Sequence, residues 1–379
     1  MKKIFTCLLT LILTVSFSNF QSLKAISANC YVLINAQTGN IIKESNCNVK
    51  KPMASTTKIM TALLLAEQNT PNKTVVVTKE MVTVEGSSMG LLPGDTVSYN
   101  DLLYGMLLAS GNDAANVTAY CLGGSINGFA KIMNEKAQEL GLKNTHFVTP
   151  SGLDDENHYT TAYDLALLAK YAMENDAFRE AASTYKATLN YGNPPYRRSL
   201  TNHNKLLKTF DGAIGVKTGF TKKSGRCLVS AAERNGKRVI AVTLKDSNDW
   251  QNHAELLEYG LNNLYSFTPT LDISTSVNVI GSNVDKINIS YKIEPIYLTK
   301  SEINSFNYKC SINNFLYAPV KQGEKLGEIK YFIKEKNFST VKIIAKTKAE
   351  VLKISFIDKF LKFFFLLLKI WGLIWKIIK

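Results

Sequence analysis

Cysteine and histidine are scarce in this sequence, which has only 6 Cys and 4 His among its 379 residues. Five cysteines remain beyond the N-terminal segment, and so odd and sparse a set does not form a disulfide scaffold. They are Cys30, Cys47, Cys121, Cys227 and Cys310. His146, His203 and His253 lack the spacing of metal ligands, so we predict no metal site and no other cofactor.

Long uninterrupted apolar runs are also missing, even at the two ends where apolar residues gather. Residues 1–25 start with Met1-Lys2-Lys3, continue through an apolar stretch over 4–17 and reach Leu23-Lys24-Ala25. This order is typical of a secretory signal cleaved near Ala25 or Ala28, and its apolar core is too short to span a bilayer comfortably. We therefore expect an exported chain, with an N-terminal anchor as the alternative.

The C-terminal segment, residues 351–379, is apolar but has a periodic polar stripe. Lys362, Lys369 and Lys376 are seven residues apart, nearly two helical turns, and the longest unbroken apolar run covers only residues 363–368. The pattern predicts an amphipathic helix that lies in the membrane plane, with Trp371 and Trp375 at the interface. A transmembrane hairpin or an oligomer seam is the alternative.

Positive charge is not spread in the way that nucleic-acid binding requires. The net charge is +14, of which residues 1–25 carry +3 and residues 351–379 carry +5, leaving +6 for everything between. No zinc-finger or RNA-binding aromatic motif accompanies this mild excess, so we expect no nucleic-acid partner. This mild positive charge suits a protein that works near an anionic membrane or wall.

Residues 26–265 are expected to form an α+β domain. A strand pair over 30–36 and 41–47 precedes helices near 55–68, 100–109, 126–140 and 165–172, and three strands over 215–221, 227–232 and 238–244 precede a helix near 250–264. This order predicts one antiparallel sheet with a helical cluster. Residues 266–350 alternate like strands and predict a small β-sandwich that serves as a spacer or interaction module.

The first strand pair suggests a disulfide. Pairing Ala36 with Ile41 across the turn would place Cys30 opposite Cys47, so we hypothesise a cross-strand disulfide. The alternative is that both are small buried residues.

Three short motifs occur in order: Ser55-x-x-Lys58, Ser110-Gly111-Asn112 and Lys217-Thr218-Gly219. The first places a hydroxyl and an amine on one face at a helix start, an arrangement that favours a nucleophilic serine. A serine three residues before a lysine also occurs at Ser183 and Ser339, so this spacing alone is weak. The conjunction of the three motifs, at a helix start, at a helix end and on a strand, is specific.

The chain resembles the penicillin-recognising serine enzymes, and within them the low-molecular-mass penicillin-binding proteins that are D-alanyl-D-alanine carboxypeptidases. The resemblance covers roughly residues 28–264 and includes Pro150-Ser151-Gly152-Leu153 with His158. It implies an α+β penicillin-binding, transpeptidase-type domain, followed by a small all-β domain and a C-terminal amphipathic helix. Both of the latter match the family's layout.

The resemblance implies a serine peptidase mechanism. Ser55 would attack the carbonyl between two D-alanines and form an acyl-enzyme. Lys58 would take the serine proton, for which its amine must be neutral, and burial and the charge of Lys217 would both lower its pKa. Ser110 would relay the proton to the departing amine.

The resemblance also implies substrate-binding residues. Asn112 would hold the substrate's backbone amide, Lys217 and Thr218 its terminal carboxylate, and Gly219 would let it lie against the strand. Backbone N–H groups of Ser55 and Phe220 would hold the oxyanion. The implied partners are peptidoglycan stem peptides ending in D-Ala-D-Ala, and β-lactams as covalent inhibitors. Four neighbours are expected to be structural: Thr56, Thr57, Asp113 and His158.

Other functions remain open at this point. Residues 86–90 match the nucleophile elbow of Ser-His-Asp hydrolases, but Pro93-Gly94 follows where a helix is needed. A β-lactamase would use the same motifs, yet no glutamate between Ser110 and Lys217 has the expected setting and Gly111 replaces the usual aspartate. A D,D-endopeptidase of the same family and a catalytically dead scaffold are further alternatives. Arg226, where the family often has an aromatic residue, is left unassigned.

Overall fold

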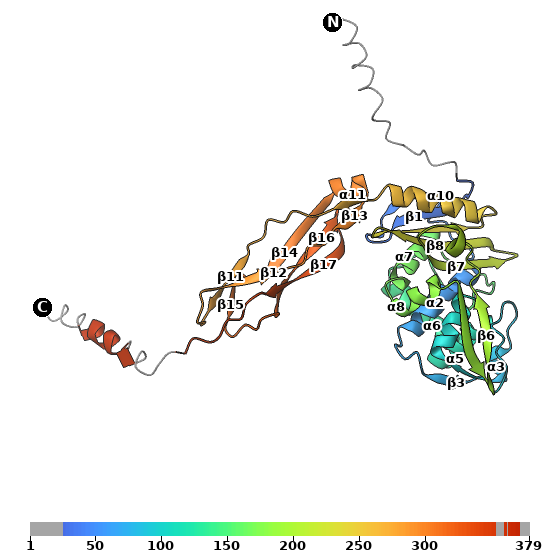
Figure 1. Cartoon of the computed structure of the whole chain (residues 1–379), viewed down its shortest axis with the longest axis horizontal. Coiled ribbons are helices and arrows are strands. Elements are labelled where there is room, and N and C mark those ends of the chain that lie inside the picture. The colour runs from blue at the N-terminus through green and yellow to red at the C-terminus, as the bar shows by residue number, and fades with distance from the viewer. Residues whose placement is uncertain (1–25, 354–359, 362, 372–379) are drawn as a thin grey trace, which may run out of the picture. The chain divides into compact units, whose positions relative to one another are not determined.

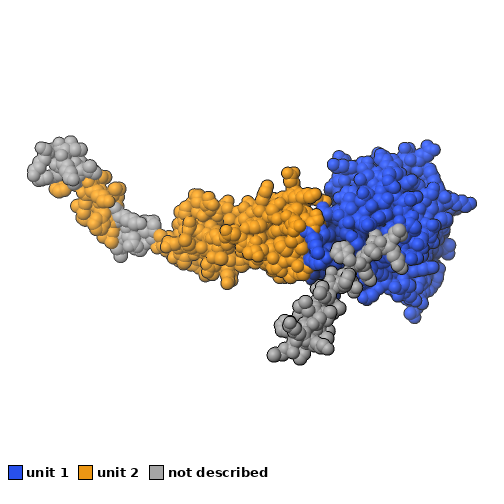
Figure 2. Space-filling model, turned by 90° about the horizontal axis from the view of Figure 1, so that it is seen from above, with its two compact units in different colours: residues 1–265, 297–300 blue, residues 266–296, 301–379 orange. Residues whose placement is uncertain are grey.

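The computed structural model describes residues 26–353, 360–361 and 363–371 (Figure 1). They divide into two compact units, one reaching to Tyr265 and including Tyr297–Lys300, the other formed by Ser266–Ile296 and the chain from Ser301 onward (Figure 2). The predicted secretory signal, residues 1–25, lies outside the described residues.

A five-stranded antiparallel sheet forms the centre of the first unit, in the order β2-β1-β9-β8-β7. Its strands are β1 (Tyr31–Asn35), β2 (Ile41–Ser45), β7 (Ala213–Thr221), β8 (Gly225–Arg234) and β9 (Lys237–Leu244). Every residue of β1 is buried, because both faces of the sheet are covered. Val32 and Ile34 pack into the cluster formed with the helices, whereas Leu33 packs with Leu256 and Leu257 of α10 on the other face (Figure 1).

The helical cluster lies on the face of the sheet opposite α10. Its central element is α2, whose residues Lys58–Leu65 are all buried. The helical elements of the unit are η1 (Ala54–Thr57), α2 (Lys58–Ala66), α3 (Lys79–Val82), α4 (Tyr99–Leu107), α5 (Asn112–Gly123), α6 (Ile126–Glu139), α7 (Ala162–Ala172), α8 (Asp176–Ser183), α9 (Leu206–Thr209) and α10 (Asp249–Asn262). Two small antiparallel pairs complete it: β3 (Thr74–Val76) with β4 (Thr96–Ser98), and β5 (Lys186–Gly192) with β6 (Pro195–Thr201).

The predicted α+β class, with an antiparallel sheet and a helical cluster, is confirmed. Helix α5 was not predicted, although it begins at Asn112 of the second motif. Asn112, Asp113 and Asn116 have low helix propensity, and their buried side chains hide the apolar periodicity of this helix.

The hypothesised Cys30–Cys47 disulfide is wrong. Tyr31 pairs with Ser45, one residue away from the register that would place the two cysteines opposite each other. Both thiols are free and buried, and the Cys30 thiol donates to the Asn46 carbonyl oxygen over 3.4 Å. Burial raises the pKa of both, that of Cys47 to about 11.

The second unit contains a six-stranded sheet in the order β14-β16-β17-β12-β11-β15, which confirms the predicted all-β class of this part. Only β11 and β15 pair in parallel. The strands are β11 (Ser276–Ile280), β12 (Lys286–Ser290), β14 (Phe306–Ile312), β15 (Phe315–Tyr317), β16 (Lys325–Ile333) and β17 (Lys336–Ala345). A two-stranded sheet of β10 (Tyr265–Phe267) with β13 (Ile296–Leu298), and helix α11 (Lys300–Asn304), occupy the chain segments where the units divide.

Residues 360–361 and 363–371 of the C-terminal segment are helical and exposed, with Phe360, Phe363 and Trp371 each more than half exposed. Within the described residues, no helix is both long enough and apolar enough to cross a membrane.

Candidate active site

The side chains of Ser55 and Lys58 meet at the junction of η1 and α2. Lys58 is 0% exposed, and its Nζ lies 2.9 Å from Ser55 Oγ, 2.7 Å from Asn112 Oδ1 and 2.8 Å from the carbonyl oxygen of Ser151. A neutral amine has two N–H donors and one lone pair. Because the Asn112 and Ser151 oxygens can only accept, the lone pair of a neutral Lys58 faces the Ser55 hydroxyl.

The electrostatic surroundings favour this neutral state. Burial lowers the pKa of Lys58 well below its usual value, and the positive charge of Lys217 lowers it further, while Asp113 acts in the opposite direction. A fully buried ammonium without a carboxylate at contact distance is costly, so the proton is readily lost.

The loop that contains Glu85 and Ser87 orients Asn112. Its Nδ2 donates to the Glu85 carbonyl oxygen over 2.6 Å, which identifies Oδ1 as the atom that faces Lys58. Its backbone N–H donates to the Ser87 carbonyl oxygen over 2.7 Å. Ser110, two residues earlier, is buried between α4 and α5 and has a left-handed φ of 59°, a conformation that non-glycine residues adopt mainly where surrounding structure enforces it.

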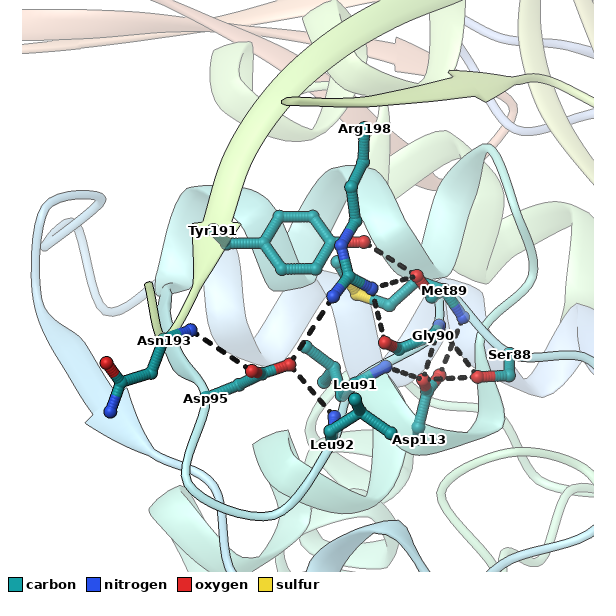
Figure 3. Close-up of polar contacts among 10 residues, drawn as sticks. All are labelled: Ser88, Met89, Gly90, Leu91, Leu92, Asp95, Asp113, Tyr191, Asn193 and Arg198. Atoms are coloured by element: carbon teal, nitrogen blue, oxygen red, sulfur yellow. Dashed lines mark hydrogen bonds and ion pairs between the residues drawn. The ribbon is translucent and has the colours of Figure 1, made fainter. Parts of the chain in front are cut away.

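The Asp113 carboxylate holds this loop in place (Figure 3). It accepts hydrogen bonds from the backbone N–H groups of Met89, Gly90 and Leu91, each over 3.0 Å, and from the Ser88 hydroxyl over 2.5 Å. The structural role expected for Asp113 is therefore observed. Since a Cβ at position 111 would lie 2.6 Å from Asp113 Oδ1, the glycine between Ser110 and Asn112 is required by this packing.

The β5–β6 hairpin binds the same loop from the other side (Figure 3). Tyr191 Oη donates to the Met89 carbonyl oxygen over 2.6 Å, and the Arg198 guanidinium donates to the carbonyl oxygens of Met89 and Gly90. That guanidinium stacks on the rings of Tyr191 and Tyr196 at 4.3 and 4.1 Å and lies 3.5 Å from the Asp95 carboxylate. No short motif marks Arg198 or Tyr191, and we did not predict either.

The third motif lies on β7, at one edge of the sheet. Lys217 is buried, its Nζ donates to the Thr218 carbonyl oxygen over 2.9 Å, and burial lowers its pKa to about 7. A Cβ on Gly219 would lie 3.1 Å from the backbone nitrogens of Ser55 and Thr56, so the glycine lets β7 approach η1 closely. The side chain of Phe220, by contrast, is 66% exposed.

A fourth segment, residues 149–158, completes the surroundings of Ser55. Gly152 has a φ of 88°, and a Cβ there would lie 1.9 Å from the Ala54 carbonyl oxygen. His158 Nδ1 accepts from the Val148 N–H over 2.9 Å, so Nε2 carries the proton that is donated to Thr57 Oγ1 over 2.7 Å. Burial lowers the pKa of His158 to about 4. His158 therefore fixes the loop, as expected, and is neutral near pH 7.

Arg226, left unassigned from the sequence, binds Asp249. Its Nε and Nη2 lie 3.0 and 2.7 Å from the two carboxylate oxygens, and its guanidinium lies over the Trp250 ring. It pairs with Phe220 in the β7–β8 register, so it borders the third motif without contacting Ser55.

The fold thus brings together residues from all three motifs. Ser55, Lys58 and Asn112 form one hydrogen-bonded group, Gly219 places β7 against η1, and Lys217 acts on Lys58 through its charge. Within the part of the chain that the structure describes, no three His, Cys, Asp or Glu side chains are grouped to hold a metal ion.

Two family models match the chain. One is described as D-alanyl-D-alanine carboxypeptidase and matches residues 17–248, and the other is described as penicillin-binding protein 5, C-terminal domain, and matches residues 270–351. The D-alanyl-D-alanine carboxypeptidase DacF of Bacillus subtilis is 34% identical over 318 residues, 80% of each chain. DacC of Escherichia coli is 30% identical over 360 residues, 88% of each chain.

Solved structures agree with these sequence matches. The D-alanyl-D-alanine carboxypeptidase DacD from Francisella tularensis has a TM-score of 0.62 at 26% identity and covers 87% of this chain and 95% of its own. Penicillin-binding protein 5 from Haemophilus influenzae has a TM-score of 0.63 at 25% identity, with 87% and 99% coverage.

Proposed function

The chain belongs to the D-alanyl-D-alanine carboxypeptidase family, and on this basis we propose that Ser55 is the nucleophile of its reaction and Lys58 the general base. The protein is a serine D-Ala-D-Ala carboxypeptidase that binds penicillin. The observation that carries the proposed roles is the set of three oxygens around the buried Nζ of Lys58, of which only Ser55 Oγ has a proton to give.

In the acylation step, Ser55 Oγ attacks the carbonyl carbon of the penultimate D-alanine while its proton passes to Lys58 Nζ. The resulting oxyanion accepts hydrogen bonds from the backbone N–H groups of Ser55 and Phe220. When the intermediate collapses, the C–N bond breaks and the leaving amine takes a proton from Lys58 through the Ser110 hydroxyl. The terminal D-alanine departs and an ester to Ser55 remains, which water then hydrolyses.

Substrate binding uses the residues around this centre. Lys217 and Thr218 bind the terminal carboxylate of a peptidoglycan stem peptide, and Asn112 binds a backbone amide of the acyl part. Gly219 lets β7 lie close to Ser55, and an extended peptide can bind along this edge strand as an added strand. A β-lactam reacts in the same way, because its ring carbonyl takes the place of the scissile amide.

Release of D-alanine from a pentapeptide analogue tests the reaction, and labelling by a fluorescent penicillin tests the nucleophile. We expect stoichiometric labelling that is lost in Ser55→Ala, with slow deacylation. Rapid turnover of penicillin would instead assign the protein as a β-lactamase, and cleavage of cross-linked peptides without release of D-alanine would assign it as an endopeptidase.

We also propose that the chain is exported and that residues 351–379 anchor it to the outer face of the cytoplasmic membrane. Support comes from the exposed apolar side chains of the described helical residues, and from the lysine stripe in the sequence. Deletion of residues 351–379 should release the protein into the soluble fraction. If the truncated chain stays with membranes, the anchor lies elsewhere.

A further inference from the structure

The second unit exposes large apolar side chains along one edge of its sheet. β15 is the edge strand, and its Phe315 and Tyr317 are 46% and 68% exposed, with their rings in edge-to-face contact at 5.6 Å. Ile280 of β11, 48% exposed, pairs with Tyr317 in the parallel register. The opposite face of these strands is buried normally, since Val279 and Leu316 pack in a hydrophobic cluster with Ile287.

The chain leaves the six-stranded sheet beside this edge. The Leu352 N–H donates to the Gly281 carbonyl oxygen over 2.9 Å, and Val351 forms a bridge with Ser282, so both residues lie next to the end of β11. Val351 and Leu352 are 53% and 49% exposed. Together with Ile280, Phe315 and Tyr317 they form a surface that we call the edge patch.

We propose that the edge patch is a second membrane-contact surface, which inserts into the headgroup region of the bilayer beside the C-terminal helix. This inference rests on the proposed anchoring by residues 351–379. Only the six residues 354–359 separate Lys353 from the described helical residues that begin at Phe360, so an anchored helix keeps the end of the unit that carries Lys353 near the membrane.

The residue types of the edge patch favour contact with lipid over contact with another protein. Tyr combines an apolar ring with a polar tip, which suits the boundary between headgroups and acyl chains. The exposed Lys321, Lys346 and Lys353 lie in the segments that lead to and from this end of the sheet, where anionic headgroups attract them. The polar groups on the open edge of β15 remain in contact with water and headgroups in this setting.

A site-specific fluorophore tests the proposal. In the full chain, with Cys7, Cys121 and Cys310 replaced by Ser, an environment-sensitive probe is attached at Tyr317→Cys. The matched control probe is at Glu335→Cys, in the exposed turn between β16 and β17. This turn lies at the end of the sheet far from Leu352, because the backbone N–H of the adjacent Lys334 donates to the Ser305 carbonyl oxygen. Vesicles of phosphatidylglycerol and phosphatidylethanolamine are added, with and without brominated lipid.

We expect the Tyr317 probe to shift to shorter wavelength and to be quenched by brominated lipid, while the Glu335 probe does neither. A Tyr317 probe that stays aqueous while the protein sediments with the vesicles would overturn the edge patch and leave the tail anchor intact. A chain that does not sediment at all would overturn both. A shift that depends on protein concentration without vesicles would identify a second copy of the chain as the occupant instead.

A double substitution provides an independent measurement. Phe315→Ser with Tyr317→Ser should weaken vesicle binding of the full chain about tenfold, because less apolar surface is buried. The matched pair Asn278→Ser with Asn288→Ser, at exposed polar positions of β11 and β12, should leave it unchanged. Equal binding by both variants, at unchanged unfolding temperature, would count against the edge patch.

Discussion

Asn112 Oδ1 lies 2.7 Å from Lys58 Nζ, and this contact joins the first two motifs into one hydrogen-bonded group. Because Asn112 Nδ2 is committed to the Glu85 carbonyl oxygen, Oδ1 can only accept from Lys58. The orientation of one amide therefore directs the lone pair of a neutral Lys58 toward Ser55.

Replacing Lys58 by Arg should slow acylation strongly, because a guanidinium keeps its proton at all working pH values. We expect the acylation rate with fluorescent penicillin to fall by about 10²–10⁴-fold, the usual contribution of a general base. Lys143→Arg, at an exposed position, is the matched control and should label normally. Unchanged acylation in a folded Lys58→Arg would disprove the general-base role.

Gly152 should not tolerate a side chain. Gly152→Ala combines a left-handed φ of 88° with a Cβ placed 1.9 Å from the Ala54 carbonyl oxygen, next to Ser55. Gly124→Ala isolates the cost of the backbone conformation, because its φ is 70° and nothing lies within 4 Å of the added Cβ. We expect about 1–2 kcal/mol of destabilisation for Gly124→Ala.

Gly152→Ala should lose about 1–3 kcal/mol more than this control, and its folded fraction should acylate slowly. Urea unfolding and penicillin labelling measure the two effects separately. Equal stability and equal labelling of the two variants would show that the segment around Gly152 does not fix the position of η1.

Sequence reasoning found the three motifs because each consists of a few adjacent residues with a distinctive chemical order. It also found the five strands of the central sheet and the helices α2, α4, α6, α7 and α10, since their periodicity is local. It missed the contributions that depend on distant segments: the Ser151 carbonyl at Lys58, and Arg198 at Met89. Any residue type can supply a backbone carbonyl, and no short motif marks an arginine on a surface hairpin.

The register of the β1–β2 pairing was also not predictable from the sequence. A shift of one residue in the β1–β2 pairing changed Cys30 and Cys47 from a cross-strand pair into two free thiols. The turn residues alone were compatible with either register, and packing of Val32 and Ile34 against the helices decides between them only once the whole unit is assembled.

Arg198 should act on catalysis through the loop that orients Asn112. Arg198→Met removes its hydrogen bonds to the Met89 and Gly90 carbonyl oxygens, and we expect acylation to slow by about 10–100-fold because Asn112 is no longer held in place. Arg197→Met, an exposed neighbour on β6, is the control and should have no effect.

A double-mutant cycle distinguishes positioning from general destabilisation. If Arg198 acts through Asn112, adding Arg198→Met to Asn112→Ala should slow acylation little further, whereas independent effects would multiply. The unfolding temperature of each variant is measured in parallel. A multiplied loss would contradict the proposed route through Asn112.

Lys217 should impose an upper pH limit on the peptidase reaction. Burial lowers its pKa to about 7, so the free enzyme loses this positive charge as the pH rises through 7, and with it the attraction for the substrate carboxylate. Lys58 must lose its proton to act as base, so kcat/KM should first rise with pH and then fall above about 7, with the fall carried by KM. Lys217→Arg keeps its charge and should lack the falling limb, as should a substrate whose terminal carboxylate is amidated. If the amidated substrate shows the same fall, the group that titrates is not the one that binds the carboxylate.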